Sequence, residues 1–391
     1  MFRNTLILLI SMLLVAACGD EDNVEPPAEL TEFDRTHYLH LEWSASTSDS
    51  IAQQYLYIEP LLLEERIVTA GRNGTLNAYD LETGEELAEV ELDVALSGGV
   101  GGTEDIWLVG SQNGELIAVD ANANDILWRT AVPSEILARP VVYNRKVVLV
   151  RTADGQILGI DINSGRINWN FSRTIPALTL RGSSPPTLSR AHVYTGLESG
   201  RLIAVSPIDG EVAWDVALTV PQGRSEIQRL VDIDGRSELY GRILYAVSYQ
   251  GRIGAIDVTR GQFLWARPFS SNTGVSVGTE AVFSTDDRGH VWALDRNNGA
   301  TLWKQDKLQA RGVTRPVIYK DFLVVGDALG YVHVMSRFDG RFVARTQVDS
   351  DGILVPPVVD DDRLLVLSRD GYLAAFSIRE SAPYTDEELF E

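Results

Sequence analysis

One short pattern recurs along the whole chain and constrains its fold more than any other feature. In the clearest copy, Ala153 to Trp169, a glycine precedes an alternating apolar segment that ends near Asp161, a turn closed by Gly165, and a segment carrying Trp169. With the leading glycine as the mark, the copies fall at Gly74, Gly114, Gly155, Gly200, Gly251, Gly289, Gly330 and Gly371. Eight copies of a unit of about 40 residues are typical of a radial or stacked repeat protein.

Each unit is predicted to form strands. Lys146 to Val150 is a β-branched run suited to a buried strand, and Gln156 to Ile162 alternates apolar residues with glycine or polar ones. The Asp-x-x-x-Gly connection predicts a hairpin, because Asp bonds its own backbone nearby and Gly accepts a positive φ. An upstream strand often starts after a proline, as at Pro140 and Pro316. Four short strands per unit are the content of one propeller blade.

The two ends of the chain are predicted to meet in one blade. The last copy reaches Ser377 and lacks its Trp-bearing strand, whereas His40 to Ser44 forms an orphan strand that carries Trp43. Joining them completes the eighth blade and removes an exposed edge. An open solenoid, the alternative, would leave both half-blades unpaired. We therefore expect an all-β, eight-bladed β-propeller of four-stranded antiparallel blades over residues 37–381, closed by the N-terminal strand.

The first 17 residues have the pattern of an export signal. Arg3 supplies a positive charge, and Thr5 to Val15 is a mostly apolar run that is shorter than the roughly 20 residues a spanning helix needs. The run ends in Leu14-Val15-Ala16-Ala17-Cys18, which resembles the bacterial lipobox, and Cys18 is the only cysteine. Residues 1–17 are thus predicted to be a lipoprotein signal peptide and Cys18 the lipidated residue. An ordinary signal with a chance cysteine is the alternative.

The segments outside the ring are acidic. Residues 18–36 contain prolines and show no apolar period, so a flexible tether between lipid and propeller is expected. Residues 382–391 are expected to be a frayed acidic tail. In lipoproteins of this kind, an aspartate directly after the cysteine tends to retain the protein in the inner membrane. Gly19 stands there instead, which implies a lipid anchor in the outer membrane of a Gram-negative bacterium, on its periplasmic face.

Composition excludes several classes of partner. The formal charge of −21 argues against nucleic acid, whose binding needs a basic surface, and against adhesion to anionic headgroups. With one cysteine, no disulfide or thiolate metal site is possible within the ring.

The sequence carries no recognisable catalytic or metal motif. The histidines, His37, His40, His192, His290 and His333, show no metal-binding helical spacing, and no nucleophile elbow, phosphate loop or dinucleotide fingerprint occurs. The repeated aspartates before the turns, such as Asp120 and Asp161, are expected to be local caps. Asp286-Asp287 and Asp360 to Asp362 are expected to be solvated turns. No cofactor, metal or catalytic residue is therefore predicted.

Unequal spacing shows where residues have been added. The intervals between marks are 40, 41, 45, 51, 38, 41 and 41 residues, and the two longest are consecutive. The extra residues follow Trp169 and Trp214, in connections between blades, so two enlarged loops should be neighbours on one rim, where binding usually resides. The polar residues of these loops allow two interpretations. Either Arg181 binds a carboxylate of a partner, or it pairs with Asp232 or Asp234 within the protein.

Together these features resemble the BamB family, the lipoprotein propellers of the outer-membrane β-barrel assembly machinery. The resemblance covers essentially the whole mature chain, and its most specific parts are the P-x-L-x-L-R-G loop at Pro176 to Gly182 and the R-L-x-D-x-D loop at Arg229 to Asp234. It implies that both loops dock on the POTRA domains of the barrel insertase BamA. The partner-binding residues it implies are Leu178, Leu180 and Arg181 in a first patch and Asp232 and Asp234 in a second. Gly235-Arg236-Ser237-Glu238 departs from the Pro-Val-Val of other blades, so that inner strand should start late.

The function expected from this resemblance is a non-enzymatic scaffold that assists folding and insertion of outer-membrane β-barrels, with other assembly subunits and unfolded barrel strands as further partners. Two alternatives remain. The repeat also resembles the tryptophan motif of quinoprotein alcohol dehydrogenases, so a periplasmic PQQ-dependent dehydrogenase or sensor is one; an adhesion propeller is the other.

Overall fold

The computed structural model describes residues 25–47, 58–174, 176, 178–180, 182 and 184–381. The expected signal peptide, the lipidated Cys18, the tail at 382–391 and Arg181 lie outside the described residues. Within the described part of the chain, no helix is long and apolar enough to cross a bilayer.

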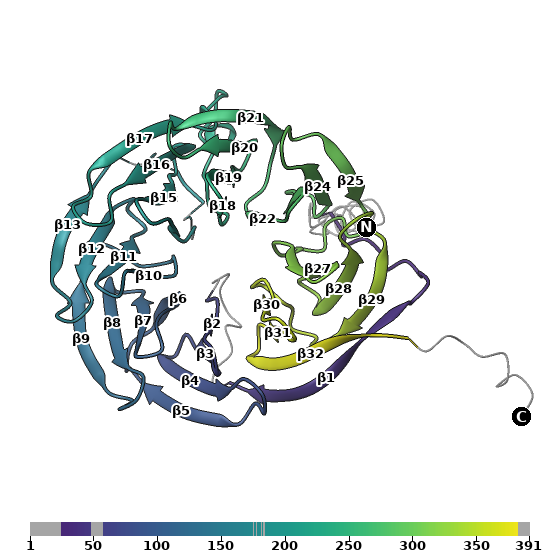
Figure 1. Cartoon of the computed structure of the whole chain (residues 1–391), viewed down its shortest axis with the longest axis horizontal. Coiled ribbons are helices and arrows are strands. Elements are labelled where there is room, and N and C mark those ends of the chain that lie inside the picture. Colours follow the sequence, from purple (N-terminus) through teal and green to yellow (C-terminus); the bar gives the residue numbers. More distant parts are fainter. Residues whose placement is uncertain are drawn as a thin grey trace, which may run out of the picture.

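The strands form eight four-stranded antiparallel sheets arranged radially about a central axis (Figure 1). The first four blades are β2 (Leu61–Leu62), β3 (Arg66–Ala70), β4 (Thr75–Asp80) and β5 (Glu86–Glu91); β6 (Leu96–Gly102), β7 (Ile106–Ser111), β8 (Glu115–Asp120) and β9 (Ile126–Ala131); β10 (Val141–Tyr143), β11 (Val147–Arg151), β12 (Ile157–Asp161) and β13 (Ile167–Phe171); and β14 (Thr187–Leu188), β15 (Val193–Gly196), β16 (Arg201–Val205) and β17 (Val212–Ala217).

The next three blades are β18 (Glu238–Tyr240), β19 (Ile243–Val247), β20 (Gly251–Asp257) and β21 (Gln262–Phe269); β22 (Val275–Val277), β23 (Ala281–Thr285), β24 (Val291–Asp295) and β25 (Thr301–Gln305); and β26 (Val317–Tyr319), β27 (Phe322–Gly326), β28 (Tyr331–Ser336) and β29 (Phe342–Gln347). The eighth comprises β30 (Val358–Val359), β31 (Leu364–Leu367), β32 (Tyr372–Glu380) and, from the other end of the chain, β1 (His37–Ser46).

The ring closes as predicted, through the N-terminal strand. β1 pairs antiparallel with β32, with Trp43 opposite Ala375. The expected eight-bladed, all-β propeller is confirmed, and the open solenoid is excluded because β1 occupies the outer edge of the eighth blade.

The core lies between successive blades. A buried apolar cluster joins Trp43 and Leu365 of the eighth blade to Tyr79 and Leu81 of the first. The indole nitrogen of Trp43 also donates a hydrogen bond to the carbonyl oxygen of Leu81 at 3.1 Å. Gly84 packs on the same indole, where a Cβ atom would lie 2.4 Å from the ring. This explains the G-x-x-x-W motif: the tryptophan of one blade needs a turn glycine in the next.

The same contact recurs around the ring. The other indole nitrogens that donate to a carbonyl oxygen in the following blade are those of Trp128, Trp169, Trp214, Trp265 and Trp303, at 2.8 to 3.1 Å. The repeated aspartates are turn caps, as predicted. Asp161 accepts backbone hydrogen bonds from Asn163 and Ser164, and hydrogen bonds, above all that of the Ser164 hydroxyl, hold the pKa of its carboxyl below the usual range.

Residues 25–36, about two thirds of the expected tether, lie against the propeller. The backbone amide of Ala28 donates to the carbonyl oxygen of Gln309 at 2.9 Å, and Arg311 donates to the carbonyl oxygen of Ala28 at 2.9 Å. Phe33 packs on Phe342 with ring centroids 5.5 Å apart. Residues 25–36 therefore form a strap along the seventh blade, which composition alone does not reveal.

Candidate functional site

The two enlarged connections have the positions predicted for them. The first joins β13 to β14 (residues 172–186) and the second joins β17 to β18 (residues 218–237). The second contains a single 3₁₀ turn, Ile227–Arg229, whose entry is fixed by the Gln228 side chain accepting the Arg224 backbone amide at 2.9 Å. β18 starts at Glu238, 13 residues before the mark Gly251, just as β26 starts at Val317, 13 residues before Gly330, so the expected late start of this inner strand was wrong.

Direct hydrogen bonds join the two loops. The backbone amide of Leu180 donates to a carboxylate oxygen of Asp232 at 2.5 Å. Nearer the ring, the Ser184 hydroxyl donates to the carbonyl oxygen of Gly235 at 3.0 Å, and the Thr187 hydroxyl donates to that of Ser237 at 2.8 Å. The loops are therefore neighbours on one rim, as unequal repeat spacing predicted, and they form one continuous surface.

Asp232 and Asp234 lie beneath this surface. Their exposed fractions are 0% and 9%. Gly182 of the first loop rests directly on Asp234, because a Cβ atom at Gly182 would lie 1.9 Å from the nearer carboxylate oxygen. The family resemblance implied that both aspartates lie in a contact patch, but their burial positions them to hold the first loop from below.

Burial perturbs the titration of both aspartates. Desolvation raises the pKa of Asp232 to about 6, and the nearby carboxylate of Glu198 adds to the rise. Desolvation raises the pKa of Asp234 to about 7, and the charge of Asp232 adds to it. Among the described residues, the opposing cation is Arg151, which forms a fully buried ion pair with Glu198 at 2.5 Å. The second loop therefore carries a buried carboxylate cluster that costs free energy when fully ionised.

Both enlarged loops expose large apolar side chains. Leu178 and Leu180 are 41% and 39% exposed. Val220 and Ile227 of the second loop are 61% and 66% exposed. We call Leu178, Leu180, Val220 and Ile227 the rim patch. Large exposed apolar side chains on irregular loops are typical of protein-binding surfaces. Sequence reasoning missed Val220 and Ile227, although the polar neighbours on both sides of Ile227 were a usable signal.

The described residues offer no metal centre. No group of three or more His, Cys, Asp or Glu side chains among them could hold a metal ion. His333 lies in β28, whereas His290 directly precedes the equivalent strand, β24, of its own blade. Each histidine hydrogen-bonds an aspartate of its own blade at 2.8 Å, Asp286 for His290 and Asp327 for His333. Asp286 was expected to be solvated, but it also accepts the indole nitrogen of Trp292 at 2.9 Å, so it is a structural acceptor.

Known proteins that this chain resembles in sequence over nearly its whole length carry one and the same family description. The family model described as outer membrane protein assembly factor BamB matches residues 72–305 and 299–382. A relative of that name from Pseudomonas aeruginosa is 40% identical over 373 residues, which cover 95% of this chain and 98% of the relative. One from Yersinia pestis is 33% identical over 390 residues, covering 96% and 99%.

Solved structures agree in fold. The crystal structure of BamB from Moraxella catarrhalis matches with a TM-score of 0.80 and 29% identity, covering 87% of this chain and 99% of that one. A quinohemoprotein alcohol dehydrogenase from Comamonas testosteroni matches with a TM-score of 0.69 at 13% identity, covering 89% and 78%. The second likeness concerns the fold alone.

Proposed function

This chain belongs to the family of outer membrane protein assembly factor BamB, and from that membership we propose that it is a non-enzymatic scaffold of the outer-membrane β-barrel assembly complex. It assists the folding and insertion of barrel proteins by holding other components in place. The propeller provides a rigid ring, and its loops provide the contacts.

The partner that this surface fits best is the set of POTRA domains of the insertase BamA. The observation that carries this part of the proposal is the hydrogen-bonded pairing of the two enlarged loops, in which Leu178 and Leu180 remain exposed. Apolar side chains held by a rigid support bind with little loss of conformational entropy. Arg181, next in sequence, supplies a charge that can pair with a carboxylate of the partner.

Within this site we assign different roles to the residues of the two loops. Leu178, Leu180 and Arg181 contact the partner. Asp232 and Asp234 act through the first loop, because their side chains are buried beneath it. Removing either aspartate is therefore expected to weaken partner binding by releasing the first loop.

The anchor completes the proposal. Lipid on Cys18 holds the protein in the outer membrane, facing the periplasm. Because residues 25–36 lie along the seventh blade, six residues, and hence seven Cα–Cα steps, connect Cys18 to the docked chain at Glu25. Fully extended, they reach about 25 Å, so the strap keeps the propeller close to the membrane.

Capture of unfolded barrel strands by β-augmentation is a separable part of the proposal. The isolated propeller should bind peptides taken from barrel strands as well as the insertase. Binding of the insertase without any binding of such peptides would remove this part and leave the scaffold role intact.

A pull-down of tagged protein from mildly solubilised membranes tests the function. Wild type should retain a large barrel protein with periplasmic repeats, Arg181→Glu should lose it, and Arg260→Glu, an exposed arginine in a turn, should behave as wild type. Equal retention by all three would contradict the assignment of the site. Absence of any such protein from the wild-type sample would contradict the scaffold function.

A further inference from the structure

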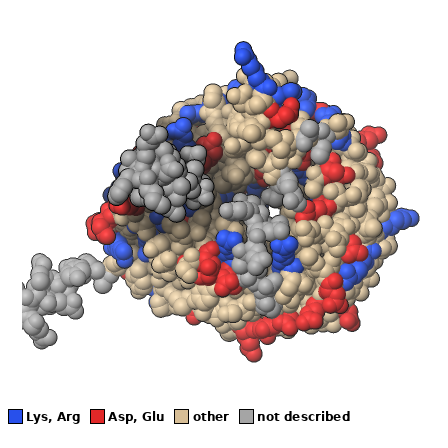
Figure 2. Space-filling view, turned by 180° about the vertical axis from the view of Figure 1, so that it is seen from behind, with Lys and Arg blue, Asp and Glu red and all other residues tan. Residues whose placement is uncertain are grey.

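The centre of the propeller is open. Seen from behind, the molecule is hollowed at its axis, with basic side chains beside the opening and acidic ones prominent along the circumference (Figure 2). A cavity of about 1000 Å³ lies on this axis and is lined by the inner strands of several blades. Binding sites for small molecules have volumes of about this size.

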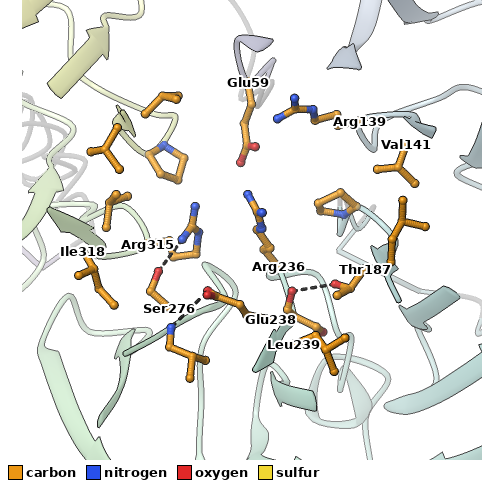
Figure 3. A pocket seen from close by; sticks show the side chains of 18 of the residues that line it. Glu59, Arg139, Val141, Thr187, Arg236, Glu238, Leu239, Ser276, Arg315 and Ile318 are labelled. Atoms are coloured by element: carbon orange, nitrogen blue, oxygen red, sulfur yellow. Dashed lines mark hydrogen bonds between the residues drawn. The ribbon is translucent and has the colours of Figure 1, made fainter. Parts of the chain in front are cut away.

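Four charged residues occupy one equivalent position of the repeat. Each stands two residues before the inner strand of its blade: Glu59 before β2, Arg139 before β10, Arg236 before β18 and Arg315 before β26. These are the first, third, fifth and seventh blades. In a closed ring, equivalent positions lie at one level around the axis, and Figure 3 shows the four side chains converging on the cavity. We call them the channel ring.

The arginines of the channel ring have few partners. Among the described residues, the side chains of Arg139 and Arg236 make no hydrogen bond and no ion pair. Arg315 donates to the Ser276 hydroxyl at 2.6 Å, while its Nε atom is buried without a partner. Guanidinium groups in a cavity normally find oxygen acceptors, so this arrangement leaves donors available.

The charges of the channel ring do not balance. Its three guanidinium groups face Glu59 and one further lining carboxylate, Glu238, so the cavity has an excess of positive charge in a chain of net charge −21. Burial and the neighbouring charge of Arg236 lower the pKa of Arg315 to about 10, which leaves it protonated at neutral pH. Burial is also the main cause that lowers the pKa of Arg139, and Arg236 contributes. The cations therefore repel one another.

We propose that the channel ring is an anion-binding site that takes a small ligand bearing carboxylate or phosphate groups. An oxyanion placed among Arg139, Arg236 and Arg315 would satisfy the free donors and remove the repulsion between them. Guanidinium groups bind such oxygens in bidentate geometry. This site is separate from the rim patch and goes beyond the assembly role.

Calorimetric titration of the full-length protein tests the proposal, with inorganic phosphate and citrate as separate probes at constant ionic strength. Wild type should bind at least one of them saturably. Arg236→Gln and Arg139→Gln should each weaken binding at least tenfold, whereas the exposed control Arg260→Gln should not. Saturation by citrate alone identifies a polycarboxylate ligand, and saturation by phosphate alone identifies a phosphate-bearing one.

Stability provides a second readout that a merely structural arginine would not give. In buffer without either probe, Arg236→Gln should unfold at a temperature no lower than wild type, because it removes a repelled charge and no hydrogen bond. Added ligand should raise the midpoint of the wild type and not that of the variant. The proposal is overturned if neither probe binds, if the variants bind as wild type does, or if Arg236→Gln is markedly less stable without ligand.

Discussion

The backbone amide of Leu180 donates a hydrogen bond to the buried carboxylate of Asp232, which lies 52 residues later in the chain. Through this bond the longest connection of the propeller supports the second longest. The backbone that carries the exposed leucines of the first loop is consequently fixed to the second loop. Residues that never reach the surface can therefore be as necessary for partner binding as those that do.

The buried carboxylate of Asp234 should make stability depend on pH in an unusual direction. Its folded-state pKa is raised to about 7, above the unfolded value of about 4. Stability from this group is therefore greatest at low pH and is lost as pH rises from about 4 toward 7. In urea unfolding, the free energy of unfolding of Asp234→Asn relative to that of wild type should rise by about 2–4 kcal/mol between pH 4 and pH 8.

An aspartate of opposite behaviour supplies the control. Backbone hydrogen bonds from Ala123 and Asn122 lower the pKa of Asp120, so stability from Asp120 is present above its unfolded pKa and is lost as pH falls. The free energy of unfolding of Asp120→Asn should therefore fall relative to that of wild type as pH rises. If the free energy of unfolding of Asp234→Asn also fell relative to wild type as pH rises, Asp234 would not be a destabilised buried acid.

Trp43 should contribute strongly to ring closure. It is 8% exposed and joins the first and eighth blades through packing and the bond to Leu81. Trp43→Phe, which removes the hydrogen bond and part of the packing, should cost about 1–2 kcal/mol, and Trp43→Ala about 3–5 kcal/mol. Urea unfolding monitored by circular dichroism measures both. A cost below about 1 kcal/mol for Trp43→Ala would mean that the remaining β1–β32 pairing closes the ring without it.

Phe33 should hold the strap on the seventh blade. The guanidinium carbon of Arg345 lies 4.9 Å from the Phe33 ring centroid, and Arg345 also donates to the carbonyl oxygen of Thr31 at 3.0 Å. Phe33→Ala should expose residues 25–36 and speed tryptic cleavage after Arg35 by roughly tenfold. Phe338→Ala, an exposed phenylalanine elsewhere, should leave the cleavage rate unchanged. Equal rates in wild type and Phe33→Ala would show that the strap does not depend on this contact.

The repeat made most of the fold predictable. The Gly, Asp and Trp positions recur at fixed offsets, and each has a local role: Asp161 caps its turn, and Trp43 docks on the next blade. Ring closure followed from the missing strand after Ser377, because a half-blade needs a partner. The adjacency of the enlarged loops followed because equivalent connections of a propeller emerge on one face.

Features that depend on distant residues were not predictable. An acidic, proline-containing segment looks flexible by composition, but Ala28 and Phe33 are held by residues about 280 to 310 positions later. The burial of Asp232 and Asp234 depends on Gly182 and Leu180 in another loop. The sequence shows two aspartates two residues apart, and local pattern does not reveal that neighbouring chain covers them.

The rim patch is the proposed docking surface for the insertase, and a binding measurement with single substitutions tests this assignment. Immobilised wild-type protein and Leu178→Glu, Leu180→Glu and Leu302→Glu variants would be titrated with the soluble POTRA domains of BamA; Leu302 is similarly exposed on an outer strand. We predict that either rim substitution weakens binding at least tenfold, which is about 1.4 kcal/mol, while Leu302→Glu binds as wild type does. Unchanged affinity in both rim variants, with all four proteins equally stable, would contradict the assignment.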